Sequence, residues 1–200
     1  MVMAGAVLLL LTGCAASGSP TPSPTPAPTS SAGSTSTPGG TGATPTADQV
    51  TWAGNVCSDT TALQNEVQAL AAVAAAGGSG VGQAISDQVT QISASVGTLV
   101  ETVKSAPTGT GDDPGYAAVR SSTDKVDQSL QKLQASASQV EGATGAALIT
   151  ALGTVVVDTG TVLTDIAATV TAISTAMKDA SSTLGQSFRA APECATLTAP

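Results

Sequence analysis

The chain contains no histidine, which removes the side chain that most often serves as a general base and a common metal ligand. Aromatic residues are almost absent, with one Trp, one Tyr and one Phe among 200 residues, so a folded core must be built from aliphatic side chains. Basic residues are scarce too: six Lys and Arg stand against fourteen Asp and Glu, for a net charge of −8. Nucleic acids select Lys- and Arg-rich surfaces, and the composition therefore predicts a protein that binds no nucleic acid.

Motifs for metal, cofactor or catalysis are also lacking. Cys57 and Cys194 lie far apart in the sequence and do not have the spacing of zinc ligands. The glycines of residues 77–82 lack the intervals of a phosphate-binding loop or a dinucleotide fingerprint, and no predicted strand precedes them. We therefore expect no metal, no cofactor and no catalytic residue, and predict that the protein is not an enzyme.

The first residues that carry information are an apolar run over residues 2–11, too short to span a bilayer and suited to the core of an export signal. The run ends in Leu11, Thr12, Gly13 and Cys14, which match the lipobox of bacterial lipoproteins. The resemblance implies a signal peptide over residues 1–13 and a lipid on Cys14, which would anchor the protein at the outer face of the cell membrane. No Lys or Arg precedes this run, although an export signal normally begins with a positive charge. A true start upstream of Met1 would supply that charge. A buried segment with an incidental cysteine is the alternative.

Residues 14–45 are rich in Pro, Ser, Thr and Gly and carry no charge. Such a composition cannot bury a core, so we predict a disordered linker, partly extended by its prolines. The folded domain is expected over residues 46–200, a length that permits one cooperative core.

If Cys14 is acylated, Cys57 and Cys194 remain as a pair near the two ends of this domain. Outside the cell such a pair predicts a disulfide, and two buried free thiols are the alternative.

Within the domain, apolar residues recur at steps of three and four, the spacing of amphipathic helices. Three such stripes cover residues 52–74, 81–103 and 116–140. A fourth region, residues 148–188, has many Val and Thr residues, which favour strands. Its apolar residues nevertheless keep the same three- and four-residue spacing, and this spacing argues against strands. The sequence therefore predicts an all-α fold, an antiparallel bundle of about four helices closed by the disulfide.

Local signals place the ends of these helices. Thr46 with Gln49 fits a capping box, and Asp113 followed by Pro114 fits a helix start. The disulfide adds a condition on the last region, because one unbroken helix from residue 146 to 189 would carry Cys194 far from Cys57. We therefore predict a break after Val140, at residues 142–145, at residues 158–160, or at both.

Two patterns in the third helical stretch resemble chemical motifs. Ser122 with Lys125 and Ser129 with Lys132 match the S-x-x-K nucleophile pattern of serine β-lactamases, but its companion motifs are absent. A solvated helix face is the favoured interpretation. Asp124 and Asp127 form a carboxylate pair that we interpret as surface charge.

At the start of the same stretch, Asp112 and Asp113 are a second pair, which we expect to complement a helix N-terminus.

Trp52-Ala53-Gly54 spells W-x-G, the motif of small secreted helical hairpins, but it lies near a helix start and not in a turn, so we expect Trp52 to pack in the core. The domain begins Trp-Ala-x-x-Val-Cys at residues 52–57 and ends Pro-x-Cys at residues 192–194. It thereby resembles uncharacterised actinobacterial lipoproteins and secreted helical proteins. The resemblance implies an envelope location and supports the disulfide, without implying an activity.

These observations predict a noncatalytic cell-envelope lipoprotein whose helical bundle serves as a protein-interaction or structural module. Its expected partners are the membrane, through the lipid on Cys14, and an unknown envelope protein. An alternative is a carrier or sensor of an apolar ligand bound between the helices, since small side chains could leave room there.

Overall fold

The computed structural model describes residues 43–197. Within this part of the chain the fold is all helical and consists of five α-helices and one 3-10 turn, in the order α1 (Ala47–Ala76), α2 (Val81–Lys104), α3 (Pro114–Ser138), α4 (Gly145–Lys178), α5 (Thr183–Ala190) and η1 (Pro192–Ala195). The predicted all-α fold is confirmed. The predicted signal peptide, the predicted lipobox and nearly all of the predicted linker lie outside the described residues.

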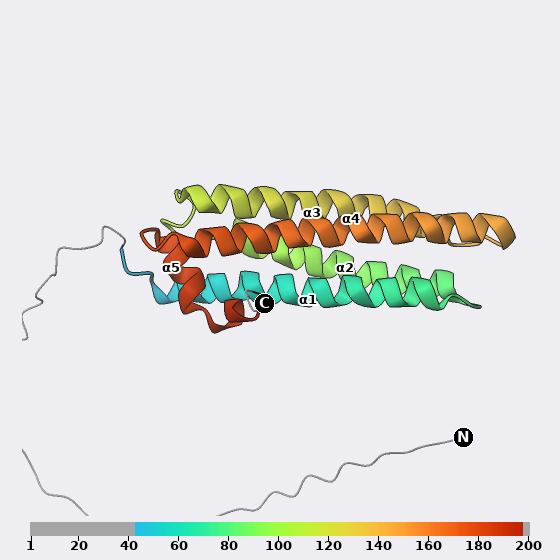
Figure 1. The fold of residues 1–200 in the computed structure, drawn as a ribbon, viewed down its shortest axis with the longest axis horizontal. Coiled ribbons are helices and arrows are strands. Elements are labelled where there is room, and N and C mark those ends of the chain that lie inside the picture. Colours follow the sequence, from blue (N-terminus) through green and yellow to red (C-terminus); the bar gives the residue numbers. More distant parts are fainter. Residues whose placement is uncertain (1–42, 198–200) are drawn as a thin grey trace, which may run out of the picture. The chain divides into compact units, whose positions relative to one another are not determined.

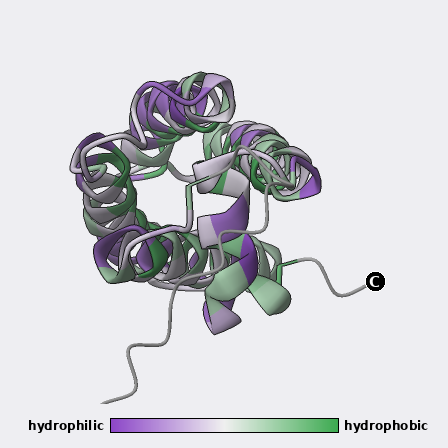
Figure 2. Cartoon of the chain, turned by 90° about the vertical axis from the view of Figure 1, so that its left-hand side faces the viewer, coloured by the Kyte–Doolittle hydropathy of each residue, from purple (hydrophilic) through white to green (hydrophobic). Residues whose placement is uncertain are grey.

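The four long helices run antiparallel, each reversing the direction of the one before it (Figure 1). Each packs against its neighbours in the chain, and α4 also packs against α1, which closes the ring seen end-on in Figure 2. The stripes at steps of three and four face the inside of this ring. The largest of the fully buried side chains in the core are Phe188 and a set of Leu and Ile residues that includes Leu63, Leu99, Ile92 and Ile166.

The predicted helix starts are confirmed. At the start of α1 the Gln49 backbone N–H donates to Thr46 Oγ1 at 3.2 Å, and the Thr46 N–H donates to Gln49 Oε1 at 2.9 Å. At the start of α3 the Gly115 N–H donates to Asp113 Oδ1 at 2.9 Å, with Pro114 as the first helical residue. The reciprocal pair at α1 and the single bond at α3 satisfy backbone donors that have no partner inside the helix.

The predicted break in the last region exists, but one of its two expected positions is wrong. Residues 142–145 form the turn from α3 into α4, with positive φ at Gly142 and Gly145. Residues 158–160 are not a break, because α4 passes through them without interruption. The reversal that brings Cys194 back to Cys57 is at residues 179–182, after Lys178.

Beyond this reversal, α5 crosses the end of the bundle and packs on α4, α1 and α3 (Figure 1). The turn η1 then places Cys194 against α1, where it forms a disulfide with Cys57; their Cα atoms are 5.1 Å apart. Both cysteines are buried. The predicted bridge is thus present, and it ties the last described segment to the first helix.

Candidate functional site

The three aromatic residues of the chain meet at the end of the bundle that α5 covers. The ring centroid of Trp52 lies 6.2 Å from that of Tyr116 and 5.7 Å from that of Phe188. Trp52 Nε1 donates to Thr102 O at 2.6 Å, and the Tyr116 hydroxyl donates to Val103 O at 2.9 Å. Since all three rings are buried and their polar atoms are paired, this cluster is core, as predicted for Trp52.

The W-x-G glycine has a packing role beside this cluster. A Cβ built on Gly54 would lie 2.6 Å from Glu193 Oε2, so the missing side chain leaves room for the carboxylate of η1 to lie against α1. This carboxylate is the end of an exposed side chain that could move aside, so Gly54 gives Glu193 its room without being required for the approach of η1 to α1.

The S-x-x-K serines do not lie on a solvated face, which corrects that interpretation. Ser122 and Ser129 are buried, and their hydroxyls donate to the Val119 and Val126 carbonyls at 2.8 and 3.0 Å. Lys125 and Lys132 are exposed. Because each serine points toward the core and each lysine toward solvent, the pattern assembles no nucleophile.

The carboxylate pairs lie at the surface of α3 and at its start. Asp124 is exposed and Asp127 half-buried, with Asp127 Oδ2 accepting from Gln131 Nε2 at 3.1 Å. Asp112 is exposed, and Asp113 is the N-cap already described. In the described part of the chain no three Asp, Glu or Cys side chains gather in a way that would hold a metal ion.

The reversal after α4 contains a carboxylate whose environment is unusual for this chain. The Ser181 hydroxyl donates to Asp179 Oδ1 at 2.6 Å, the Ser181 and Ser182 backbone N–H groups donate to the same oxygen, and Arg189 lies nearby. These bonds, the Ser181 hydroxyl first, hold the pKa of Asp179 below its ordinary value, although the group is fully exposed. Asp179 is thus a cap that shapes the turn.

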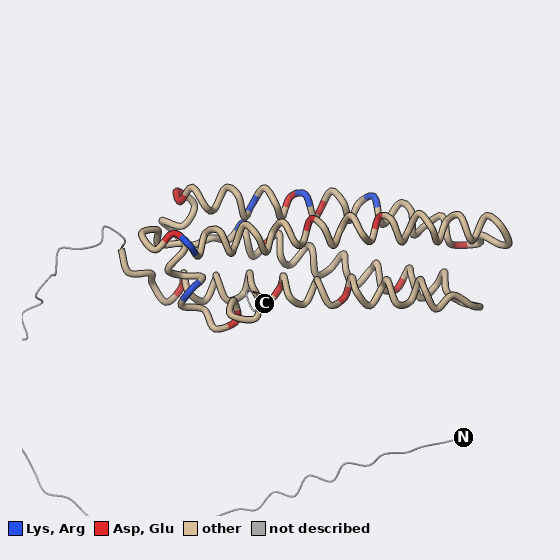
Figure 3. Tube along the Cα trace, viewed as in Figure 1, with Lys and Arg blue, Asp and Glu red and all other residues tan. Residues whose placement is uncertain are grey.

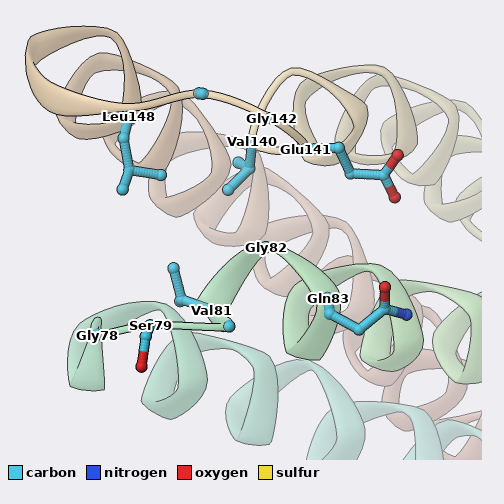
Figure 4. A pocket seen from close by; sticks show the side chains of 11 residues that line it. Gly78, Ser79, Val81, Gly82, Gln83, Val140, Glu141, Gly142 and Leu148 are labelled. Carbon is cyan, nitrogen blue, oxygen red and sulfur yellow. The ribbon is translucent and has the colours of Figure 1, made fainter.

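A pocket of about 510 Å³ opens at the opposite end of the bundle, between the α1–α2 and α3–α4 turns (Figure 4). Glycines are prominent in its lining, with Gly78, Gly82 and Gly142 among them. The Val140 and Leu148 side chains line it from the α3–α4 side, whereas Ser79, Gln83 and Glu141 make the rest polar. The pocket is an open, mixed surface and not an enclosed apolar chamber.

Helix α4 differs from the others in composition. By length and apolar content it could cross a membrane, and only 22% of its most apolar stretch is buried. Its large exposed apolar side chains are Ile149, Val156 and Val157. The periodicity of the sequence locates the buried stripe of α4, but it does not indicate that large apolar side chains are also exposed on this helix.

Of the residues singled out from the sequence, the structure brings together Cys57 and Cys194. Leu11, Thr12, Gly13 and Cys14 lie outside the described residues. Sequence reasoning missed Asp179 and Ser182, although a run of Asp and Ser just before an apolar residue is typical of a helix start. Comparisons with protein-family models, with curated proteins and with solved structures give no match.

Proposed function

We propose that the protein is a noncatalytic lipoprotein of the cell envelope, anchored through an acyl group on Cys14, whose bundle acts as an interaction or structural module. The lipobox over residues 11–14 and the apolar run before it supply the anchoring signal. The bundle begins at Ala47, so about thirty residues separate the acylated cysteine from the folded domain. Such a spacer lets the module contact partners at some distance from the membrane.

The observation that carries the location is the Cys57–Cys194 bridge. Disulfides form and persist in oxidising compartments, which in bacteria lie outside the cytoplasm. Because both sulfurs are buried, a reductant reaches the bridge only when the domain opens. An intracellular protein would gain little from two cysteines arranged in this way.

The noncatalytic role is supported by how the candidate groups are placed. The Ser122 and Ser129 hydroxyls are hydrogen-bonded to carbonyls of their own helix. The Asp124 carboxylate is exposed, and the Asp127 carboxylate accepts a hydrogen bond from Gln131. A catalytic acid or base is typically found in a cleft that shifts its pKa, together with a second group. In the described residues, the pocket at the glycine turns holds one carboxylate, Glu141.

The carrier of an apolar ligand is the weaker proposal. A ligand between the helices would have to displace large aliphatic side chains such as Leu63, Ile92 and Ile166, which are fully buried. The pocket at the glycine turns has a suitable volume but a mixed lining. We therefore favour the interaction module.

The test is the intact mass of the protein extracted from the membrane of its native host. We expect a chain that begins at Cys14, carries acyl mass, and gains two alkyl groups only after reduction under denaturing conditions. A Cys14→Ser variant is the control and should lose the acyl mass while keeping the bridge. An unprocessed chain whose Cys57 and Cys194 are alkylated without reductant would refute both the anchor and the location.

A further inference from the structure

The chain has three cysteines, and the structure accounts for two of them. Cys57 and Cys194 form the buried bridge, whereas Cys14 lies outside the described residues. A third thiol in the same chain can form a wrong bridge before the right one, because disulfides form and exchange by attack of any thiolate that reaches them. The outcome of folding therefore depends on which cysteine Cys57 meets first.

In the unfolded chain Cys57 meets Cys14 more often than it meets Cys194. The native bridge joins residues with a sequence separation of 137, and Cys14 precedes Cys57 by less than a third of that separation. Because the probability of loop closure falls with the three-halves power of loop length, the shorter loop closes about fivefold more often. Chain order adds to this preference, since an N-terminus that emerges first presents Cys14 and Cys57 before Cys194.

Partial folding does not protect Cys57, because the last described element is the one that covers it. Cys194 Sγ lies 3.5 Å from the Ala53 carbonyl oxygen, so η1 lies over the surface of α1 that carries Cys57. This turn follows α4, the reversal and α5 in the chain, and it reaches α1 after the rest of the bundle has been built. Until η1 arrives, its side of α1 lacks a cover and the Cys57 sulfur can react.

The thiol of Cys14 can reach this surface. Helix α1 begins at Ala47, so Cys57 lies about 15 Å along the helix from the end of the predicted linker. A segment of about thirty residues with this composition has an average end-to-end distance of about 30 Å. Helix α1 has acidic residues but no Lys or Arg (Figure 3), and residues 14–45 have no charge, so no electrostatic repulsion keeps the two sulfurs apart.

We propose that transfer of the lipid to Cys14 precedes the oxidation of Cys57, and that the lipid removes the thiol that would form the wrong bridge. This second role of the lipid rests on the proposed anchor. In the transfer, the Cys14 sulfur forms a bond to a lipid carbon, and its proton leaves with the head group of the donor phospholipid. A sulfur bonded in this way has no proton to lose, so it can neither enter a disulfide nor attack one.

The oxidation is then confined to the correct pair. The thiols of Cys57 and Cys194 lose two protons and two electrons as their S–S bond forms, and a dithiol oxidase accepts them while its own disulfide is reduced to two thiols. Once η1 is in place both sulfurs are buried, and the bridge is protected from further exchange. The lipid is therefore needed on Cys14 between export and the arrival of η1.

The test is oxidation of the full mature chain, residues 14–200, made without lipid so that Cys14 keeps its thiol. The reduced, unfolded chain is mixed with oxidised glutathione, and samples are alkylated at intervals and cleaved before aspartate. Aspartates lie between each pair of cysteines, so every cysteine falls in its own peptide and mass spectrometry identifies each bridge. Before folding, we expect the Cys14–Cys57 bridge to exceed the Cys57–Cys194 bridge about fivefold.

The matched control is Cys14→Ser, which keeps the length of the chain and lacks the thiol. When the two chains refold during oxidation, the control should form the Cys57–Cys194 bridge alone and several-fold faster. A chain with the Cys14 thiol that forms the native bridge as fast as Cys14→Ser overturns the proposal. A wrong bridge that joins Cys14 mainly to Cys194 also overturns it, because the loop argument requires Cys57 as the partner.

A variant in the native host tests the order of the two reactions. Gly13→Asp disrupts the predicted lipobox and keeps the thiol, so exported chains of this variant should accumulate the Cys14–Cys57 bridge, whereas the wild type should contain the native bridge alone. Exported Gly13→Asp chains that lack lipid and contain the native bridge alone would overturn the proposal. Absence of lipid mass from the wild type would instead refute the anchor, and the proposal with it, whatever the rates measured with the purified chains.

Discussion

The two ends of the bundle are held together in different ways. At the end that α5 covers, three aromatic rings, the Cys57–Cys194 bridge and a side-chain N-cap at Ser182 join α1, α3, α4 and α5. At the other end, the two turns rely on glycines with positive φ, and neither α2 nor α4 begins with a side-chain cap. The pocket of about 510 Å³ opens between these turns.

This difference shows that a chain with 2% aromatic residues places its few large rings at one end of the bundle. The few large rings are not spread along the core but are placed where the last segment returns to α1. Aliphatic stripes hold the rest of the bundle, together with a few hydrogen bonds between helices, such as Ser95 Oγ to Glu66 Oε1 at 3.0 Å. We therefore expect slow amide exchange near Trp52 and faster exchange near residues 77–80.

Removing the bridge should have the largest effect on this comparison. Cys57→Ala with Cys194→Ala frees a loop with a sequence separation of 137 residues. The loop-entropy model gives a loss of about 4 to 5 kcal/mol in the free energy of unfolding. Denaturant titration of the double variant measures it, and a loss below about 1 kcal/mol would mean that the bridge does not restrain the unfolded chain as this model requires.

A methyl group at Gly185 should have the next largest effect. A Cβ there would lie 2.3 Å from the Ala176 and Asp179 carbonyl oxygens, so Gly185→Ala must push α5 away from the end of α4. We expect a loss of about 2 to 3 kcal/mol in the free energy of unfolding, with faster amide exchange in α5.

The matched variant at the other end is Gly82→Ala. Its Cβ would meet Val140 O at 3.4 Å, a contact that a small movement relieves, and alanine also favours helix. The free energy of unfolding should change by less than about 0.5 kcal/mol. Equal losses at Gly82 and Gly185 would contradict the view that the α5 end is the tightly packed one.

The smallest effect is expected at Asp179. Its pKa is lower in the folded chain than its ordinary 3.8, so the charged carboxylate stabilises the fold above that value. This stabilisation is lost as the pH falls through the folded pKa. Comparing wild type with Asp179→Ala from neutral pH to pH 2, we expect a small difference in melting temperature that narrows in acid; a difference that grows in acid would reverse the sign.

Local signals in the sequence were enough for most of the fold. The capping box at Thr46, the Asp113-Pro114 start and the stripes at steps of three and four each depend on residues within one or two turns of helix, and each is found where it was expected. The disulfide was predictable because, once Cys14 is assigned to the predicted lipobox, Cys57 and Cys194 are the two cysteines that remain. Its length condition correctly required a break after Val140, but of the two expected positions residues 158–160 were wrong, and the chain turns back toward Cys57 at residues 179–182.

What the sequence by itself determined is therefore the all-α fold, the inward face of each helix and the pairing of Cys57 with Cys194. The tertiary structure decided the position of the reversal, at residues 179–182. Helix α4 ends there because α5 can then pack Phe188 against Trp52 and place Gly185 close to the carbonyl oxygens of Ala176 and Asp179. It also decided that the side of α4 opposite its buried stripe stays exposed although it carries no charge. Periodicity shows which face of a helix is buried, but whether a second uncharged face is covered too depends on the neighbouring helices, and those contacts exist only once the bundle has formed.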